Sequence, residues 1–398
     1  MLRAELGALR EGQVLTPVQL TLAEASALNR SALVNVTPEG DGWRVTAAYA
    51  VGVVRCGDLV VRVHPKVGVL KVLELLARAR GIRNFAVDPS RVELAAYAEL
   101  STVLAVLFAL EAQQAMGSGP LRGYRTEEQS LPVLRGRLRM AEQYLRRHGS
   151  VSPLEVTVDE WTLDTDDNRR LRAAGRALLT LAEVPARTRV GLLRLDRQLT
   201  EVATATRGTQ LAPWTPTRLN VRLHALLHLA DLVLAHSSVE HGPGGTTTHG
   251  FVINMATLFE NLVAQLLGEA ASGLLTQQSL PLDTLGRLTI RPDLVFHAGG
   301  VAVAVADTKY KLLDEDGKVP NADAYQLVAY CSRLGLRTGH LIYAAGEPHS
   351  EPYDMVGTDV RLVIHSIDLR RTVAGIEAQL TAVLGLILAS VDARLLTA

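Results

Sequence analysis

The sequence predicts an α+β protein with more than one domain, and three observations support this. The chain has 398 residues, more than a single domain usually contains. Alternating apolar and polar residues between turn residues dominate the first segment, whereas apolar residues at helical spacing dominate the second. In the last segment helical and strand-like stretches alternate, which is typical of a mixed sheet flanked by helices. We therefore expect a β-rich domain at 1–90, a mainly helical domain at 91–250 and a domain with a mixed sheet at 251–398.

The composition excludes several classes of protein. Lys and Arg total 41, as do Asp and Glu, so DNA affinity must come from local basic patches or from a partner. Cys56 and Cys331 stand far apart, which argues against a disulfide framework or a zinc site. The N-terminus lacks the apolar core of a signal peptide, and the longest apolar runs are too short to cross a membrane. We expect a cytoplasmic protein that does not contact a membrane.

The first two segments contain recognisable strands and helices. In the first, the pattern predicts strands at 31–36, 43–54 and 59–64 and a helix at 69–80. In the second, it predicts helices at 94–114, 138–147 and 220–237, a further helix starting near 164, and a short strand at 154–158. The stretch 121–137 is polar and is assigned no helix or strand, and the Gly- and Thr-rich stretch 241–249 is interpreted as a flexible break at the last domain boundary.

The third segment has a defined order of elements. The pattern predicts a helix at 255–271, then a hairpin, a helix at 321–334, strands at 339–344 and 360–367, and a closing helix at 371–387. The hairpin consists of strands at 288–296 and 301–307, joined by a turn at Gly299 and Gly300.

One end of this hairpin carries acidic and basic side chains. Asp293 lies in its first strand and Asp307 at the end of its second, so strand pairing brings the two carboxylates close together. Because Asp307 and Lys309 are separated by one residue, strand alternation places both on one face. The uninterrupted apolar run 301–306 is expected to be buried on both faces.

This trio favours phosphodiester chemistry. Two clustered carboxylates repel each other, and a hard cation such as Mg²⁺ relieves that repulsion while also binding phosphate and water. The ammonium of Lys309 can orient or deprotonate the attacking water, or stabilise charge on the phosphate. Taken singly, Asp293 is typical of a turn, and Asp307 of a strand end that reaches solvent. Their order and topology together predict a catalytic site that holds one or two Mg²⁺ ions.

Pro292-Asp293 followed by Asp307-x-Lys309 resembles the motif of the PD-(D/E)xK nuclease superfamily. That resemblance implies a core of helix, hairpin, helix and strand, which is the order predicted here. It also implies that a Glu on the helix before the hairpin completes the metal site, and Glu260 lies at the matching place.

Longer stretches narrow the resemblance. Segments 255–263, 291–293, 307–311 and 325–330 look like the McrC subunit of the McrBC 5-methylcytosine restriction system, and 134–138 and 159–171 are similar to the central region of that family. The resemblance implies a DNA endonuclease that works with an McrB-like AAA+ GTPase ring, docks into it through the N-terminal domain and stimulates its GTP hydrolysis. It implies double-stranded, methylated DNA as the substrate. The chain itself lacks a GxxxxGK[ST] loop, so GTP is expected on the partner and not on this chain.

Several further residues are candidates for contacts. Gln326 and Tyr330 lie four apart on one helical face, and the resemblance implies that this helix lines the active site. Gln326 would then hold a phosphate or a water, although a structural amide is the alternative. We also consider four possible contacts to DNA or to the partner: Arg135, Arg137, Lys311 and Tyr330. His340 and the other histidines lack paired metal-ligand spacing and are interpreted as structural.

Three alternatives stay open. The chain could be a non-catalytic adaptor that activates an AAA+ ring, although an intact set of Asp293, Asp307 and Lys309 argues against a pure scaffold. It could be a PD-(D/E)xK repair or defence nuclease that works without a GTPase. The domain at 1–90 could also bind DNA itself.

Overall fold

A computed structural model describes residues 2–82, 99–148, 150–180, 184–204, 212–241, 247–310, 320–344, 346 and 349–391. The chain divides into two compact units. Unit 1 comprises 1–100, 241–248 and 252–398, and unit 2 comprises 101–240 and 249–251. The expected multidomain α+β character is confirmed, since both units combine helices with strands. The finer domain limits at 90 and 250 stay a prediction.

The N-terminal part of unit 1 is β-rich, as expected. Its elements are η1 (Leu2–Ala8), β1 (Leu9–Arg10), β2 (Val14–Val18), α1 (Leu22–Arg30), β3 (Val34–Glu39), β4 (Gly42–Ala47), β5 (Ala50–Cys56), β6 (Leu59–His64) and α2 (Val69–Ala79). Strands β2, β4 and β3 form one sheet, whereas β1, β6 and β5 belong to another, which β11 (Thr247–Asn254) extends next to β5. Apolar side chains from both sheets and from α1 form one core.

Two expectations for this part need correction. The strand predicted at 43–54 is broken after Ala47, because β4 and β5 lie in different sheets. Helix α1 was not expected, yet its start is well encoded: Thr21 accepts a hydrogen bond from the Glu24 amide, and the Glu24 side chain accepts one from the Thr21 amide.

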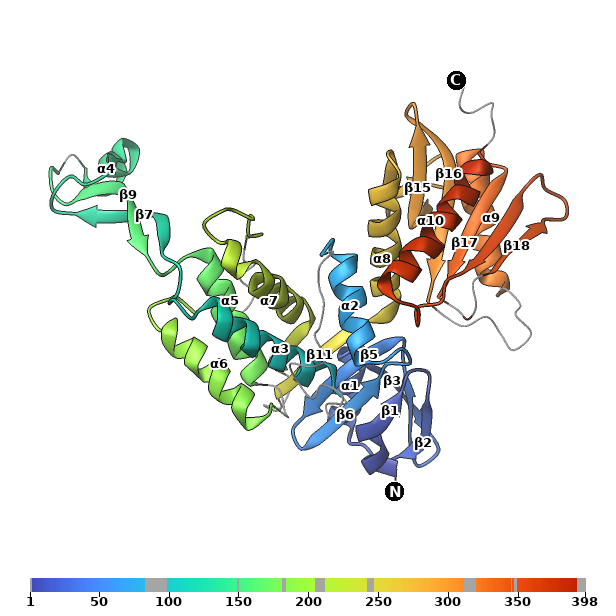
Figure 1. Ribbon diagram of the computed structural model, residues 1–398, viewed down its shortest axis with the longest axis horizontal. Coiled ribbons are helices and arrows are strands. Elements are labelled where there is room, and N and C mark those ends of the chain that lie inside the picture. The colour runs from blue at the N-terminus through green and yellow to red at the C-terminus, as the bar shows by residue number, and fades with distance from the viewer. Residues whose placement is uncertain are drawn as a thin grey trace. The chain divides into compact units, whose positions relative to one another are not determined.

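The C-terminal part of unit 1 is built around a six-stranded mixed sheet. Its elements are α8 (Met255–Ala270), β12 (Leu274–Thr276), β13 (Leu280–Pro281), β14 (Thr289–Ile290), β15 (Leu294–Ala298), β16 (Val301–Lys309), α9 (Asn321–Leu334), β17 (Thr338–Tyr343), β18 (His349–Asp354), β19 (Arg361–Ser366) and α10 (Val373–Ala389). The strand order is β12-β15-β16-β17-β19-β18. Strands β16, β17 and β19 are parallel, and the other neighbouring pairs are antiparallel. Figure 1 shows this sheet with α8, α9 and α10 around it.

Burial along the sheet explains how α9 is fixed. Val305, Leu341 and Ile364 from three neighbouring strands share a core with Leu327 and Cys331 of α9. The helix approaches β17 so closely that a Cβ atom on Gly339 would lie 2.6 Å from the Cys331 sulfur. Glycine at this position therefore allows the helix to cover the central strands.

The hairpin differs from the expectation in two details. The predicted strand 288–296 is interrupted at 291–293, between β14 and β15, where Pro292 has no amide hydrogen to donate to a ladder. Strand β16 is buried from Val303 to Thr308, but Val301 and Ala302 beside the hairpin turn are at least partly exposed. Burial on both faces therefore holds for the end of the strand that carries the acidic residue and not for its start.

Unit 2 combines a helical body with a long hairpin-like pair. Its elements are α3 (Leu100–Ala115), β7 (Gly123–Leu131), β8 (Arg137–Leu138), α4 (Met140–Arg147), β9 (Leu154–Thr162), α5 (Asp166–Leu179), α6 (Ala186–Gln198), η4 (Val221–Leu223), α7 (His224–His236) and β10 (Ser237–His241). Strands β7 and β9 pair antiparallel over their full lengths. We call residues 123–162 the arm, because Figure 1 shows them projecting from the helices α5, α6 and α7.

The arm contains a strand that the sequence does not predict, and the predicted break at 241–249 lies partly outside the described residues. The polar stretch 121–137 contains β7, in which partly buried and exposed residues alternate, so it lacks a strong apolar pattern. The stretch 241–249, interpreted as a flexible break, contains the end of β10 and the start of β11, with 242–246 outside the described residues. No helix in the described part of the chain is both long and apolar enough to cross a membrane.

Candidate active site

The register of the β15–β16 hairpin brings the two aspartates together. Leu294 pairs with Ala306, so the residue before Leu294, Asp293, comes opposite Asp307. Asp293 does not continue the strand ladder. Its Oδ2 instead accepts hydrogen bonds of 2.7 Å from both the amide and the hydroxyl of Thr308. The interruption of the strand therefore fixes the Asp293 side chain against the end of β16.

Lys309 follows on the same face, as the two-residue spacing predicts. Its Nζ forms an ion pair with Asp307 Oδ2 and donates a 3.1 Å hydrogen bond to Oε1 of Gln326 on α9. Sheet and helix thus converge on one ammonium group. Besides the ion pair, Asp307 Oδ2 accepts no hydrogen bond of acceptable geometry from the described residues.

Asp307 is the most unusual acid of the cluster. Its side chain is almost fully buried, and burial together with the charge of Asp293 raises its pKa to about 6, against the opposing effect of Lys309. Buried Asp323 adds a further, smaller raising effect on this pKa. A carboxyl group that is buried, repelled by a neighbour and short of donors favours the approach of a cation.

Glu260 comes from α8. The side chain of Asn254 caps the start of this helix by accepting a 3.0 Å hydrogen bond from the Thr257 amide. Glu260 is half-buried, and its Oε1 accepts a hydrogen bond from Nε2 of Gln277. Burial raises the pKa of Glu260, and the nearby charge of Asp293 raises it further, while the hydrogen bond from Gln277 lowers it. Glu260 therefore lies within electrostatic reach of the aspartate pair.

A chain of hydrogen bonds continues from Lys309 across α9. Gln326 accepts from Lys309 and donates through Nε2 to the Tyr330 hydroxyl at 2.6 Å, which donates in turn to the carbonyl of Arg291 at 3.3 Å. Tyr330 is buried, and burial raises its pKa to about 12. The ring of Tyr330 packs in the core and its hydroxyl faces the site, and its contact with DNA or a partner stays a prediction.

The other contact candidates differ in availability. Arg135 donates two hydrogen bonds, of 2.6 and 3.0 Å, to Glu160 within the arm. Arg137 is exposed at β8. Lys311 lies outside the described residues. Of the two arginines, Arg137 is therefore the more available for a contact with another molecule.

The donor set fits a magnesium ion that is completed by its substrate. Among the described residues, no three His, Cys, Asp or Glu side chains converge closely enough to enclose a metal. Mg²⁺ does not need such a cage, because it commonly binds one or two carboxylates together with phosphate oxygens and water. Asp293 and Asp307 supply that pair, and apart from the Lys309 ammonium no described group donates to Oδ2 of Asp307.

Sequence reasoning missed four residues of this site. Thr308 holds Asp293, Gln277 holds Glu260, and Arg291 contacts Gln277. Asp323 accepts a 2.7 Å hydrogen bond from the Tyr343 hydroxyl beneath the cluster. Only Thr308 and Arg291 carried a signal, since they lie inside the two motifs. Gln277 and Asp323 carry none, because their neighbours are set by folding.

The residue after Lys309 connects the site to the N-terminal part of unit 1. The Tyr310 hydroxyl donates to both carboxylate oxygens of Glu11, at 3.2 and 3.3 Å, and Glu11 also accepts the Lys66 amide at 3.1 Å. The Tyr310 ring packs edge-on against Tyr49 and lies 6.4 Å from the ring of Phe259, the neighbour of the candidate ligand on α8. The end of β16 is thereby tied to both parts of the unit.

The chain is similar to known proteins over most of its length. Residues 45–344 match the family described as "McrBC 5-methylcytosine restriction system component". The chain belongs to this family. The resemblance to an McrBC component that the sequence indicates is therefore confirmed, and the matched range includes all of the candidate site residues. No curated protein matches the chain.

Solved structures agree at the level of the fold. One similar chain comes from a half-complex of a tetradecameric assembly of Thermococcus gammatolerans McrB AAA+ hexamers with bound McrC. That likeness has a TM-score of 0.61 at 18% identity and covers 95% of this chain and 99% of the other. A second, from the Thermococcus gammatolerans McrBC complex, has 20% identity, covers 65% and 86% of the two chains, and at a TM-score of 0.41 supports no argument.

Proposed function

We propose that this chain is the DNA-cleaving subunit of a modification-dependent restriction system and acts as a Mg²⁺-dependent endonuclease. The observation that carries the proposal is Asp307, a buried carboxyl group with a raised pKa that faces Asp293 and contacts Lys309. A structural carboxylate at such a position would be expected to accept hydrogen bonds at both of its oxygens. Membership of the McrBC family supports a role in restriction.

Each residue has a distinct part in the proposed reaction. Asp293 and Asp307 would hold the ion, and Glu260 on α8 would assist them. When bound, Mg²⁺ lowers the pKa of a water molecule and neutralises charge on the phosphate. Lys309, held by Gln326 at 3.1 Å, is placed to orient the attacking water and to stabilise the negative charge that develops on the phosphate.

The order of elements supports assignment to the PD-(D/E)xK superfamily. Helix α8 is followed by the β15–β16 hairpin, then by α9 and β17, which is the order that the resemblance implies. Asp293 and Asp307 lie at the end of the hairpin away from its turn. Lys309 lies two residues beyond Asp307 on the same face of β16. We therefore propose that the C-terminal part of unit 1 is the nuclease.

Delivery to DNA is proposed to depend on an McrB-like AAA+ ring, which binds and hydrolyses GTP and is stimulated by this chain. The resemblance implies docking through 1–90, but exposed apolar side chains gather on the arm. Eight large apolar residues are exposed there: Tyr124, Val133, Leu134, Met140, Tyr144, Leu145, Val151 and Trp161. Such a concentration is typical of a protein-binding surface, so we assign the ring contact to the arm.

Cleavage of methylated double-stranded DNA by the assembly, with GTP and Mg²⁺, tests the proposal. We expect the wild-type chain to cut, and Asp307→Ala to abolish cutting while stimulation of partner GTP hydrolysis persists. Asp359→Asn is the matched control, because Asp359 is exposed and its ion pair with Arg337 is long, at 4.0 Å. Equal cutting by wild type and Asp307→Ala would favour the adaptor, and cutting without the ring would favour a stand-alone nuclease.

A further inference from the structure

Gln277 joins three parts of the candidate site. It follows β12 directly, and its amide donates a 3.0 Å hydrogen bond to the Asp293 carbonyl. Its side-chain Nε2 donates to Glu260, and its Oε1 accepts from Nη2 of Arg291 at 2.5 Å. The Arg291 Nε also donates to the Gln277 carbonyl at 3.2 Å. One residue thereby contacts the helix glutamate, the arginine and the backbone of the first aspartate.

The backbone of Gln277 is in an unfavourable conformation. Its φ is +51°, in the left-handed region that glycine and asparagine adopt most readily. A residue with a longer side chain is held there only when the surrounding contacts fix it. At Gln277 those contacts all lead to the candidate site. The sequence therefore keeps a long amide side chain where backbone preference alone would favour a smaller residue.

An amide suits the task of holding Glu260. A Lys or Arg would neutralise the carboxylate and compete with a cation for it, whereas the neutral amide of Gln277 orients one oxygen without cancelling its charge. The contact from Arg291 fixes which end of the amide faces Glu260, because the guanidinium can only donate and therefore requires the amide oxygen.

The same residue closes a longer series of contacts around the aspartate pair. Lys309 donates to Gln326, Gln326 to Tyr330, and Tyr330 to the Arg291 carbonyl. The Arg291 side chain then reaches Gln277, which reaches Glu260. Lys309 on β16 and Glu260 on α8 are thus held by one connected set of contacts.

We propose that Gln277 is a positioning residue of the metal site, which fixes the orientation of Glu260 beside Asp293 so that Glu260 can assist the aspartate pair in binding a divalent cation. This inference rests on the proposed function, because it assumes that the aspartate pair binds the cation. Gln277 itself does not touch the ion. Its effect is on how tightly the site binds the cation.

Mn²⁺ binding to the full chain without DNA, followed by electron paramagnetic resonance, tests this. Gln277→Asn keeps a residue that tolerates positive φ but is too short to reach Glu260, and Gln277→Gly removes both strain and side chain. We expect each to weaken Mn²⁺ binding by roughly tenfold or more. Thermal stability should be unchanged or higher in Gln277→Gly, which separates positioning from a structural role.

Gln265→Asn is the matched control, because Gln265 donates a 2.8 Å hydrogen bond to Glu269 on the same helix as Glu260. It should leave Mn²⁺ binding unchanged. If wild type binds Mn²⁺, Asp307→Ala does not, and both Gln277 variants bind like wild type, the positioning role is overturned while the proposed function stands. If wild type and Asp307→Ala fail alike to bind Mn²⁺, the metal site and the positioning role are overturned together.

Discussion

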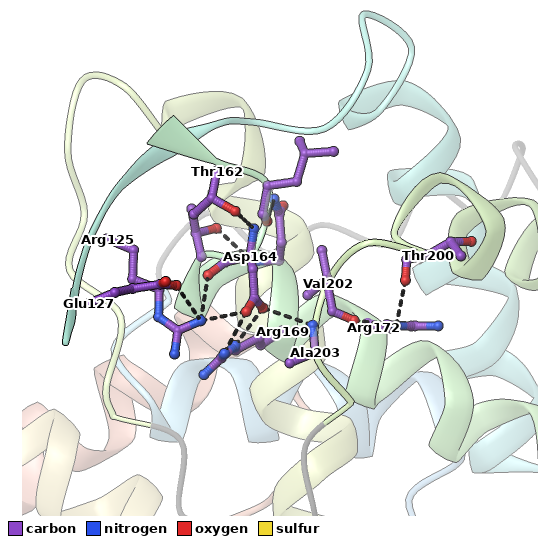
Figure 2. A network of polar contacts seen from close by, with 12 residues as sticks. Arg125, Glu127, Thr162, Asp164, Arg169, Arg172, Thr200, Val202 and Ala203 are labelled. Carbon is purple, nitrogen blue, oxygen red and sulfur yellow. Dashed lines mark hydrogen bonds and ion pairs between the residues drawn. The ribbon is translucent and has the colours of Figure 1, made fainter. Parts of the chain in front are cut away.

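Asp164 in unit 2 and Asp307 in unit 1 are both carboxylates beside basic side chains, yet their surroundings are opposite. Figure 2 shows Asp164 at the centre of a network with Arg125, Arg169 and the Ala203 amide. Arg169 donates two hydrogen bonds of 2.6 Å and Ala203 one of 2.8 Å. These hydrogen bonds and charges, led by Arg169, lower the pKa of Asp164 to about 2.

Asp307 has one ammonium partner and a neighbouring carboxylate, and its pKa rises to about 6. The difference teaches how to separate structural from chemical acids in one chain. Where donors saturate the carboxylate, as at Asp164, the charge stabilises the fold. Where burial and repulsion outweigh the stabilisation from donors, as at Asp307, the ionised carboxylate is destabilised in the folded chain. A bound cation would relieve that destabilisation.

The largest expected effect is on catalysis and comes from Lys309. We expect Lys309→Met to lower the cleavage rate of the assembly by about 10² to 10³, because it removes the charge that faces the reacting phosphate. The same change should tighten Mn²⁺ binding, since the two aspartates lose their competing cation. Cleavage kinetics and metal titration measure the two effects. Weaker Mn²⁺ binding would indicate that Lys309 shapes the ligands instead of acting on the phosphate.

A buried histidine pair extends the comparison to groups that are fully satisfied. Ser390 donates its hydroxyl to the Ile387 carbonyl, so it must accept from His340 Nε2 at 3.0 Å. His340 Nδ1 then accepts from His365 Nε2 at 3.0 Å, and His365 Nδ1 accepts from Ser350 at 2.8 Å. Each ring nitrogen therefore has one hydrogen-bond partner, with a defined donor and acceptor, when both rings are neutral. The expectation that His340 is structural agrees with this arrangement.

Acid should therefore destabilise unit 1 through these rings. Burial lowers the pKa of His340 to about 3 and of His365 to about 4, so below about pH 6.5 the unfolded chain binds protons that the folded chain excludes. The free energy of unfolding is therefore highest above that pH. Below it, the free energy of unfolding falls by about 1.4 kcal/mol per pH unit for each proton that the folded chain excludes. Urea unfolding from pH 7 to 5 measures the slope. His365→Gln should flatten it, and an unchanged slope would contradict the neutral pair.

The next effect concerns Asp164. We expect Asp164→Asn to reduce the free energy of unfolding of unit 2 by about 2 kcal/mol, because charge-assisted hydrogen bonds are lost. Since the pKa of Asp164 is lowered, this contribution is present above about pH 4 and is lost as the pH falls toward 2. Chemical unfolding of the variant at neutral pH measures it. Full stability in the variant would remove the structural half of the comparison.

The smallest effect is expected at the connection between the site and the N-terminal part of unit 1. Tyr310→Phe removes the hydroxyl that Glu11 accepts and should cost about 1 kcal/mol of stability. A double-mutant cycle with Glu11→Gln measures the coupling between the two side chains. Strict additivity would show that the hydrogen bond contributes nothing.

Local patterns predicted much of the candidate site. The two-residue spacing of Asp307 and Lys309 fixed their common face, and the short hairpin turn set the register that brings Asp293 opposite. Helices α8 and α9 were predicted within one residue of their bounds, because their apolar spacing is regular. These features depend on neighbours in sequence, which a single chain reveals.

The remaining features depend on partners far apart in the chain. Gln277 reaches Glu260 only because β12 pairs with β15, and Tyr310 meets Glu11 across 299 residues. Strand β7 was missed because both its faces are partly exposed, so no apolar alternation marks it. Such contacts follow from tertiary packing and leave no local signal.

The central claim is that burial and repulsion from Asp293 destabilise the ionised form of Asp307, and that a bound cation relieves this. Thermal unfolding of the isolated chain with and without Mg²⁺ tests the claim directly. We predict that Asp307→Asn raises the melting temperature without Mg²⁺, because repulsion from Asp293 is relieved, and that Mg²⁺ stabilises the wild type but not the variant. A variant that melts below the wild type and responds to Mg²⁺ in the same way would contradict the claim.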